Sequence, residues 1–199
     1  MSLRNYFRKE PLNYAEWRSE GLLGLIVSFE KRKVLQALKI KEGDFILDAG
    51  SGDGFYAGIL VEQGARVLGV DISRHMIGDL KKKNIDGVVA DIEHLWFRRT
   101  FDKVLCAGAM EFLRNPSDAI KSFRNALRDV GVLVICYPRK SPFAYLYKLY
   151  HLLRGRRISL FSMREFEDLV ADMFDIETNI HAGIVSAVIK CRKKAKGNS

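Results

Sequence analysis

The strongest constraint on this chain is a glycine-rich turn that directly follows a short apolar run. Residues 45–48 are Phe-Ile-Leu-Asp, and Gly50, Gly52 and Gly54 follow at alternate positions. Such a run is typical of a buried strand in a parallel sheet. The glycines allow a tight turn and a close approach to a ligand, and the next helix presents its first N–H groups to that ligand. We therefore expect a nucleotide-type site at the carboxyl end of the first strand of an α/β sheet.

The spacing of the glycines separates one kind of nucleotide from another. A dinucleotide loop needs G-x-G-x-x-G, but the third glycine position is occupied by Phe55, and the sequence has no Walker-type Gly-Lys-Ser/Thr. Asp48 stands two residues before the first glycine, where a carboxylate would repel a pyrophosphate. The same carboxylate suits a ligand that carries an ammonium or sulfonium group. The loop therefore favours S-adenosylmethionine (SAM) over NAD.

The rest of the chain alternates between strand and helix patterns. The 199 residues suit a single domain over 1–199, and an apolar content of 48% is enough for a sizeable core. Strands are expected at 45–48, 66–70, 87–90, 103–106 and 132–137, and helices at 20–38, 56–63, from Ser73 onward and at 116–127. This predicts a Rossmann-like, doubly wound parallel sheet with helices on both faces. Strands at 175–180 and 184–191 form a hairpin, which makes one edge antiparallel.

Two segments are expected to lie outside this alternation. Residues 1–41 are predicted to form an N-terminal helical cap, and residues 139–160 a lid inserted after the fifth strand. A helix expected at 143–153 is apolar on nearly all sides, which implies that it is buried or meets a partner surface. Three arginines, at positions 154, 156 and 157, follow it.

Charge is distributed unevenly along the chain. The formal net charge is +9, and the excess of Lys and Arg falls in residues 1–41 (nine against four acids) and 138–199 (twelve against six). This serves solubility, or it attracts an anionic partner such as a phosphate, a lipid headgroup or RNA. No aromatic-rich RNA motif supports a dedicated nucleic-acid module.

The cysteines and the hydropathy pattern indicate a cytoplasmic protein. Cys106, Cys136 and Cys191 include no CxxC pair and fall in predicted strands, so we expect buried thiols in a reducing compartment. No run of 18 apolar residues is present, so no membrane span is expected. No metal site is expected either.

Three acids stand at the ends of successive predicted strands: Asp48, Asp71 and Asp91. Asp71 lies 21 residues after Gly50, which is the distance at which an acid binds ribose hydroxyls in related sheets. Asp91 is placed to accept a hydrogen bond from an exocyclic amine. Together with the glycine loop, the three acids indicate a site for a nucleoside.

In these motifs the chain resembles the class I SAM-dependent methyltransferases, especially the broad group that acts on small molecules. The matching segments are ILDAGSGDG at 46–54, LGVDIS at 68–73, ADI at 90–92, FDKVLC at 101–106, MEFL at 110–113 and GVLVI at 131–135. The resemblance implies a seven-stranded sheet with an antiparallel last strand. It implies SAM as the cofactor and S-adenosylhomocysteine as the product.

The resemblance also implies the residues that bind the cofactor. The methionyl part would meet the segment from Asp48 and Ala49 through Gly50, Ser51 and Gly52. Asp71 would bind the ribose. The adenine would contact Ile72, Met76, Asp91 and Ile92, and the reactive methyl group would lie near Cys106 and Ala107.

The implied activity is in-line methyl transfer to a small or lipid-like, anionic acceptor. A base is needed only if the acceptor must lose a proton, and the sequence offers Tyr14, Glu111 and His151 as weak candidates. Helix 143–153 and its arginines could form a lid, or rest transiently on a membrane surface. A non-catalytic SAM-binding protein and an RNA methyltransferase stay open as alternatives. Nucleic acid is the less favoured partner, because Ala-Gly-Ala-Met at 107–110 replaces the Asn/Asp-Pro-Pro-aromatic motif of enzymes that methylate nucleic-acid amines.

Overall fold

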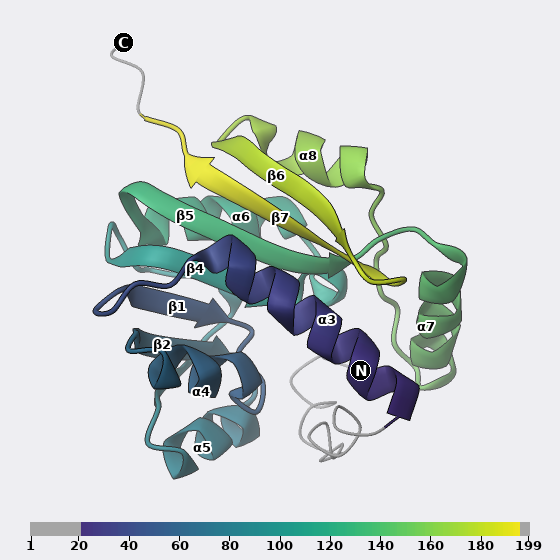
Figure 1. The fold of residues 1–199 in the computed structure, drawn as a ribbon, viewed down its shortest axis with the longest axis horizontal. Helices are drawn as coiled ribbons and strands as arrows, with labels where there is room; N and C mark the ends of the chain where they lie inside the picture. Colours follow the sequence, from purple (N-terminus) through teal and green to yellow (C-terminus); the bar gives the residue numbers. More distant parts are fainter. Residues whose placement is uncertain (1–20, 196–199) are drawn as a thin grey trace.

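A computed structural model describes residues 21–195 and contains one seven-stranded sheet with helices on both faces (Figure 1). The strands lie in the order β3-β2-β1-β4-β5-β7-β6. Their bounds are β1 Phe45–Ala49, β2 Arg66–Asp71, β3 Asp86–Val89, β4 Phe101–Ala107, β5 Leu127–Pro138, β6 Phe174–Ala182 and β7 Ser186–Lys193. Strands β1 to β5 pair in parallel, and β7 pairs antiparallel with both β5 and β6. The predicted doubly wound sheet with an antiparallel edge is confirmed.

Helices cover both faces of the sheet. They are α3 Gly21–Leu38, α4 Phe55–Glu62, α5 Arg74–Lys82, α6 Pro116–Ala126, α7 Pro142–Leu153 and α8 Met163–Ala171, with short 3-10 turns η1 Ile92–His94 and η2 Met110–Phe112. In Figure 1, α3, α4 and α5 lie in front of the sheet and α6 and α8 behind it. The helical part of the predicted N-terminal cap, α3, therefore packs on a face of the sheet. Residues 1–20 of that cap lie outside the described residues.

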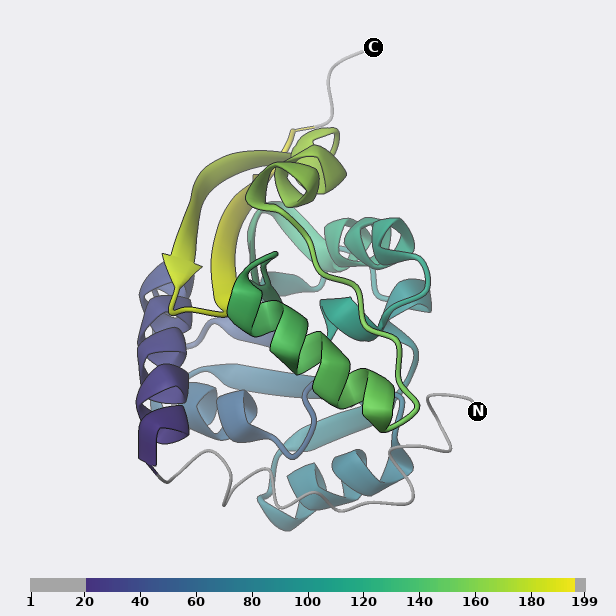
Figure 2. The ribbon, with the colours of Figure 1, turned by 90° about the vertical axis from the view of Figure 1, so that its right-hand side faces the viewer.

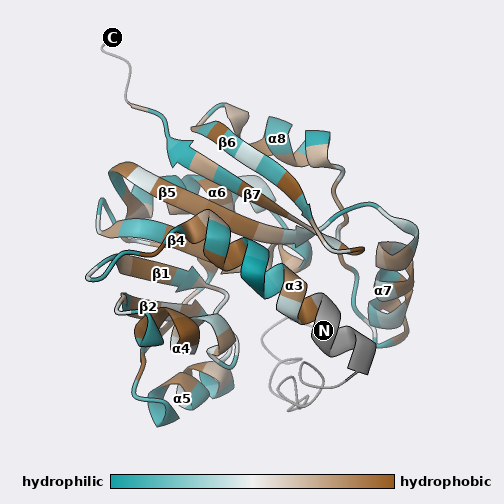
Figure 3. Ribbon diagram, in the orientation of Figure 1, coloured by the Kyte–Doolittle hydropathy of each residue, from teal (hydrophilic) through white to brown (hydrophobic). Residues whose placement is uncertain are grey.

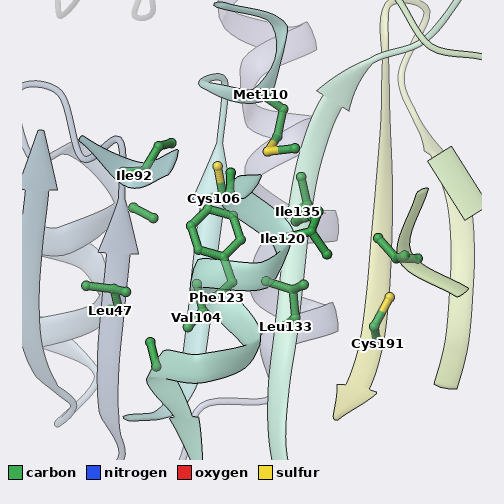
Figure 4. Close-up of a cluster of buried hydrophobic side chains, with 14 of the residues drawn as sticks. Leu47, Ile92, Val104, Cys106, Met110, Ile120, Phe123, Leu133, Ile135 and Cys191 are labelled. Carbon is green, nitrogen blue, oxygen red and sulfur yellow. The ribbon is translucent and has the colours of Figure 1, made fainter. Parts of the chain in front are cut away.

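Alternating side chains of the central strands build a core on each face. Along β5, Leu133 and Ile135 pack with α6 and α8 in one apolar cluster, whereas Val134 and Cys136 pack with α3 and α4 in another. This follows from the two-residue period of a strand. Figure 4 shows the first cluster, in which Phe123 of α6 lies against the strands. The three cysteines are free and buried, as expected.

Local signals in the sequence place most of the element boundaries. Ser73 accepts a hydrogen bond from the Met76 N–H at the start of α5, and Ser162 and Glu165 form a reciprocal capping box on α8. Strand β5 is longer than predicted, because Leu127 already pairs with Phe101 before the register shifts and Val132 pairs with Lys103. The register is irregular between these two pairs, which a hydrophobic-run argument does not detect.

Helix α7 lies apart from these layers, across the edge of the sheet where the parallel strands end (Figure 2). Only Ala144 and His151 of this helix are buried, so of the two alternatives left open by the sequence the structure does not support burial. Figure 3 shows apolar residues in the central strands and again on α7, outside the main core. Among the described residues, no helix is both long and apolar enough to cross a membrane.

Candidate active site

The carboxyl ends of β1, β2, β3 and β4 meet at a cavity of about 310 Å³. Such an edge is where open α/β sheets bind ligands. Ten of the twelve predicted cofactor residues line this cavity: Asp48, Gly50, Ser51, Gly52, Asp71, Ile72, Met76, Asp91, Ile92 and Ala107. Ala49 and Cys106 do not, since neighbours along a strand point to opposite faces and these two side chains lie in the core cluster with α6.

The glycine loop is held against the end of β2. The N–H groups of Gly50 and Ser51 both donate to the Val70 carbonyl, at 2.7 and 3.0 Å. Gly50 has φ +76°, and a Cβ atom there would lie 2.5 Å from the Cβ of Ala109. These two N–H groups are thus used within the protein. What the glycines of the loop provide is a stretch of cavity wall at which the backbone carries no side chain.

Asp71 joins that loop to the helix that follows β2. Its Oδ2 accepts from the Gly52 N–H at 3.0 Å and its Oδ1 from the Ser73 N–H at 2.8 Å. Burial raises the pKa of this carboxyl, and the backbone hydrogen bonds oppose the rise. Because each carboxylate oxygen has two acceptor positions, Asp71 keeps capacity for a hydroxyl group of a ligand.

The other two acids occupy different environments. Asp48 is buried, only 2% exposed, in the wall formed by β1. Asp91 accepts a hydrogen bond from the Glu93 N–H at 2.9 Å and so caps the turn η1. Between the acids lie the apolar side chains of Ile72, Met76 and Ile92. This set fits a ligand with a cationic end, a hydroxylated middle and a flat apolar ring, which is the chemistry of SAM.

The turn η2 and helix α7 form a second part of the cavity wall, its other end, where Glu111 of η2 lines the cavity and is almost completely buried. Burial raises its pKa to about 7, and the nearby Glu30 adds to the rise, while a hydrogen bond from Tyr147 lowers it. A carboxyl that titrates near neutral pH can accept or release a proton under cellular conditions. Burial also raises the pKa of the Cys106 thiol well above its usual value, so Cys106 stays protonated.

His151 lies behind this end of the cavity. Its ring makes edge-on contacts with Tyr147 at 4.5 Å and Phe112 at 5.4 Å between ring centres. Burial and the charge of Arg154 lower its pKa to about 4. Its Nδ1 has no hydrogen-bond partner among the described residues. His151 is therefore neutral and supports two residues of the wall, while Tyr14 lies outside the described residues.

Several wall residues were not predicted as site residues. Glu30 reaches the cavity from α3, Tyr147 from α7, and Phe55 and Tyr56 from α4. Glu30 and Tyr147 belong to the predicted cap and lid, so the sequence did indicate that these segments lie near the site. Nothing in the sequence indicated Ala109, because its role depends on its distance from Gly50 in the folded chain. In the described part of the chain, no group of three His, Cys, Asp or Glu residues could hold a metal ion.

Comparison with known proteins agrees with this geometry. Residues 47–135 match a family model described as a methyltransferase domain. A tRNA U34 carboxymethyltransferase of Aeromonas hydrophila is 28% identical over 131 residues, which cover 60% of this chain and 37% of that protein. A ubiquinone biosynthesis O-methyltransferase of Coxiella burnetii is 29% identical over 164 residues, covering 75% of this chain and 70% of that protein. The chain thus spans only part of the length of these relatives.

Solved structures share the fold. A methyltransferase of Haloferax volcanii, solved in complex with the Trm112 methyltransferase activator, superposes with a TM-score of 0.81 over the full length of both chains at 13% identity. The magnesium protoporphyrin IX methyltransferase of Synechocystis PCC 6803, solved with S-adenosylhomocysteine, gives a TM-score of 0.75 at 20% identity, covering 96% of this chain and 98% of that one. At these identities the likeness concerns the fold alone.

Proposed function

We propose that this chain, which carries a class I SAM-dependent methyltransferase domain, moves a methyl group from SAM to a small or lipid-like, anionic acceptor. The observation that carries the proposal is one cavity with two chemically different ends. One end has three strand-end acids and a glycine loop, and the other has a buried Glu111 with a pKa of about 7. The first end suits a cationic nucleoside, and the second suits a group that must lose a proton.

The residues of the first end would hold the cofactor in parts. Asp48 would attract the charged methionyl end, Asp71 would accept from the ribose hydroxyls, and Asp91 would accept from the adenine amine. Ile72, Met76 and Ile92 would form the apolar surface for the ring. When bound, SAM supplies an electrophilic methyl group on a sulfonium centre. The presence of S-adenosylhomocysteine in the Synechocystis neighbour supports this choice of cofactor.

The residues of the second end would prepare the acceptor. Glu111 would take the proton of an acceptor hydroxyl or amine, and Tyr147 would orient Glu111 through their hydrogen bond. Tyr147 and Phe112 would fix the acceptor's position in the wall, and aligned reactants can lower a barrier by about 7–11 kcal/mol. Burial of Glu111 would limit the access of water to the proton transfer.

Two features favour an apolar acceptor with a negative charge. The wall at this end is aromatic, and the guanidinium of the buried Arg156, which does not itself line the cavity, lies 5.7 Å from the centre of the Phe112 ring. Burial lowers the pKa of Arg156 to about 10, which leaves it charged at neutral pH. The Coxiella relative, named for O-methylation in ubiquinone biosynthesis, supports an acceptor of this class. The proposed setting is a reducing cytoplasm, where free buried thiols persist.

RNA is a second candidate acceptor. The net charge of +9 and the Aeromonas relative, whose name refers to tRNA, favour it. Binding to RNA would be strongly salt-dependent, because phosphate contacts release counterions. A third reading is a protein that binds SAM without catalysis.

One experiment separates the three. The purified chain is incubated with SAM labelled in its methyl group and with a cell extract divided into lipid, metabolite and RNA fractions. Label in the lipid or metabolite fraction supports the proposal, and loss of that label in Glu111→Gln links it to this site. Label in the RNA fraction alone would contradict the proposed acceptor and show that RNA is methylated instead. Binding of S-adenosylhomocysteine without any labelling would leave only the non-catalytic reading.

A further inference from the structure

The outer side of α7 carries an apolar surface that nothing in the described structure covers. Leu146, Leu149 and Leu153 are 64%, 50% and 80% exposed. They are three and four residues apart, so they form one stripe along the helix. Phe143, Tyr145 and Leu152 are also more than half exposed. A run of exposed apolar side chains on one helix marks an interaction surface rather than ordinary surface variation.

The charges around this stripe have one sign. Residues 138–164 contain seven Lys or Arg and no Asp or Glu. Lys148 and Arg157 are exposed beside the stripe and just after the helix. Two tyrosines, Tyr145 and Tyr150, belong to the same helix, and amphipathic aromatic rings of this kind favour the interface between lipid and water.

The inner side of α7 fixes the helix beside the cavity. Ala144 packs with Ile158 and Leu160, and Tyr147 packs against the same small cluster while lining the cavity. The Ser141 hydroxyl donates to the Ile184 carbonyl at 3.0 Å, which ties the start of α7 to the β6–β7 turn. The leucines of the helix are exposed and its Tyr147 lines the cavity, and Figure 2 shows the helix lying across the edge of the sheet where the parallel strands end.

We propose that the outer face of α7 docks on an anionic lipid bilayer. The helix would lie in the interface plane, with Leu146, Leu149 and Leu153 below the headgroups and Lys148 and Arg157 among the lipid phosphates. Of the seven basic residues, Arg156 is buried and Lys140 pairs with Glu165. A protein partner would need an acidic surface to match the exposed remainder, whereas an anionic bilayer offers apolar and acidic groups over any area. Docking would bring the cavity next to the bilayer, so an amphiphilic acceptor could reach Tyr147 without crossing bulk water.

Vesicle flotation of the purified full chain, without SAM, tests the proposal independently of methyl transfer. Vesicles of phosphatidylcholine and phosphatidylglycerol in equal parts should bind the chain, and vesicles of phosphatidylcholine alone should bind it much less. The triple variant L146Q/L149Q/L153Q should lose about 100-fold in affinity, because three leucines no longer enter the apolar layer. The double variant K148Q/R157Q should lose about 30-fold on the anionic vesicles alone.

A matched control carries three exposed apolar residues changed elsewhere, V61Q/V130Q/I176Q, and should bind as the unchanged chain does. Thermal melting and binding of S-adenosylhomocysteine confirm that each variant is folded. The proposal is overturned if the unchanged chain ignores anionic vesicles, or if the α7 variant and the control bind equally. It is also overturned if the leucine stripe instead joins two copies of the chain, which would appear as a dimer that the triple variant abolishes and that does not bind vesicles.

Discussion

The two ends of the cavity are built in different ways. At the end formed by β1, β2 and β3, the acids Asp71 and Asp91 accept backbone hydrogen bonds from residues close to them in sequence or in the neighbouring loop. At the end formed by η2 and α7, the buried Glu111 accepts a hydrogen bond from Tyr147, whose ring packs edge-on against His151. The first end is held by the strands and their turns. The second depends on a helix of which only two residues are buried.

This contrast indicates that the first end determines which cofactor is bound, whereas the second end can change with the methyl acceptor. Backbone hydrogen bonds fix the position of an acid whatever side chains surround it, so the first end tolerates little change. Aromatic packing under a lightly held helix can be rebuilt by changing a few side chains. We therefore expect substitutions at the first end to affect cofactor binding, and those at the second to affect turnover and its pH dependence.

The largest effect is expected from Glu111→Gln. A positioned base contributes about 10²- to 10⁴-fold to a rate, so turnover should fall within that range while affinity for S-adenosylhomocysteine stays unchanged. The unchanged enzyme should gain activity as the pH rises through about 7, the pKa of Glu111, and the variant should lack that rise. A variant as active as the original, with the same pH profile, would remove Glu111 from the mechanism.

The same carboxyl should also make folding pH-dependent. Its pKa is raised from 4.5 to about 7 in the folded state, so the folded chain binds more protons than the unfolded chain between these values. The stability that this group contributes is thus present below pH 4.5 and falls as the pH rises towards 7, by about 3 kcal/mol. Urea unfolding at both pH values, compared with Glu111→Gln, measures it. Parallel changes in both proteins would mean that Glu111 titrates normally.

At the first end, Gly50→Ala should be destabilising by about 2–3 kcal/mol. The new Cβ would lie 2.5 Å from Ala109 in a backbone conformation that favours glycine. Gly58→Ala is the matched control, because a Cβ there meets nothing within 4 Å and alanine favours a helix. Thermal unfolding should show a loss for the first variant and a small gain for the second; equal stabilities would contradict the described loop.

Asp71→Asn should weaken binding of S-adenosylhomocysteine by about 10- to 100-fold, because one charge-assisted acceptor is lost and the amide group must face a backbone N–H. Asp86→Asn, at the exposed start of β3, is the control and should bind normally. Calorimetric titration measures both. Unchanged affinity in Asp71→Asn would exclude the ribose assignment.

The smallest effect is expected from Tyr147→Phe. It removes the hydrogen bond that lowers the pKa of Glu111, so the rise in activity should move to higher pH and the rate at pH 7 should fall about threefold to tenfold. Tyr145→Phe, whose side chain is exposed on the same helix, should behave as the original. If both variants have the original profile, the hydrogen bond from Tyr147 does not set the pKa of Glu111.

The contrast between the ends also explains what the sequence could predict. The glycine loop, the acids at the strand ends and the Ser73 cap are short-range patterns, and the structure brings Asp48, Asp71 and Asp91 to one cavity as expected. The partners at the other end are distant in sequence: Glu30 and Tyr147 both meet Glu111. Hydrophobic periodicity and motif spacing do not predict contacts between residues so far apart in the sequence. For the same reason the sequence left open whether helix 143–153 was buried or faced a partner.

Isothermal titration of the purified chain with S-adenosylhomocysteine and, separately, with NADH tests the central claim most directly. A carboxylate at position 48 beside a bare glycine loop should admit the first compound and reject the pyrophosphate of the second. We predict saturable heat with S-adenosylhomocysteine at one site per chain and none with NADH. Heat with NADH and none with S-adenosylhomocysteine would contradict the account.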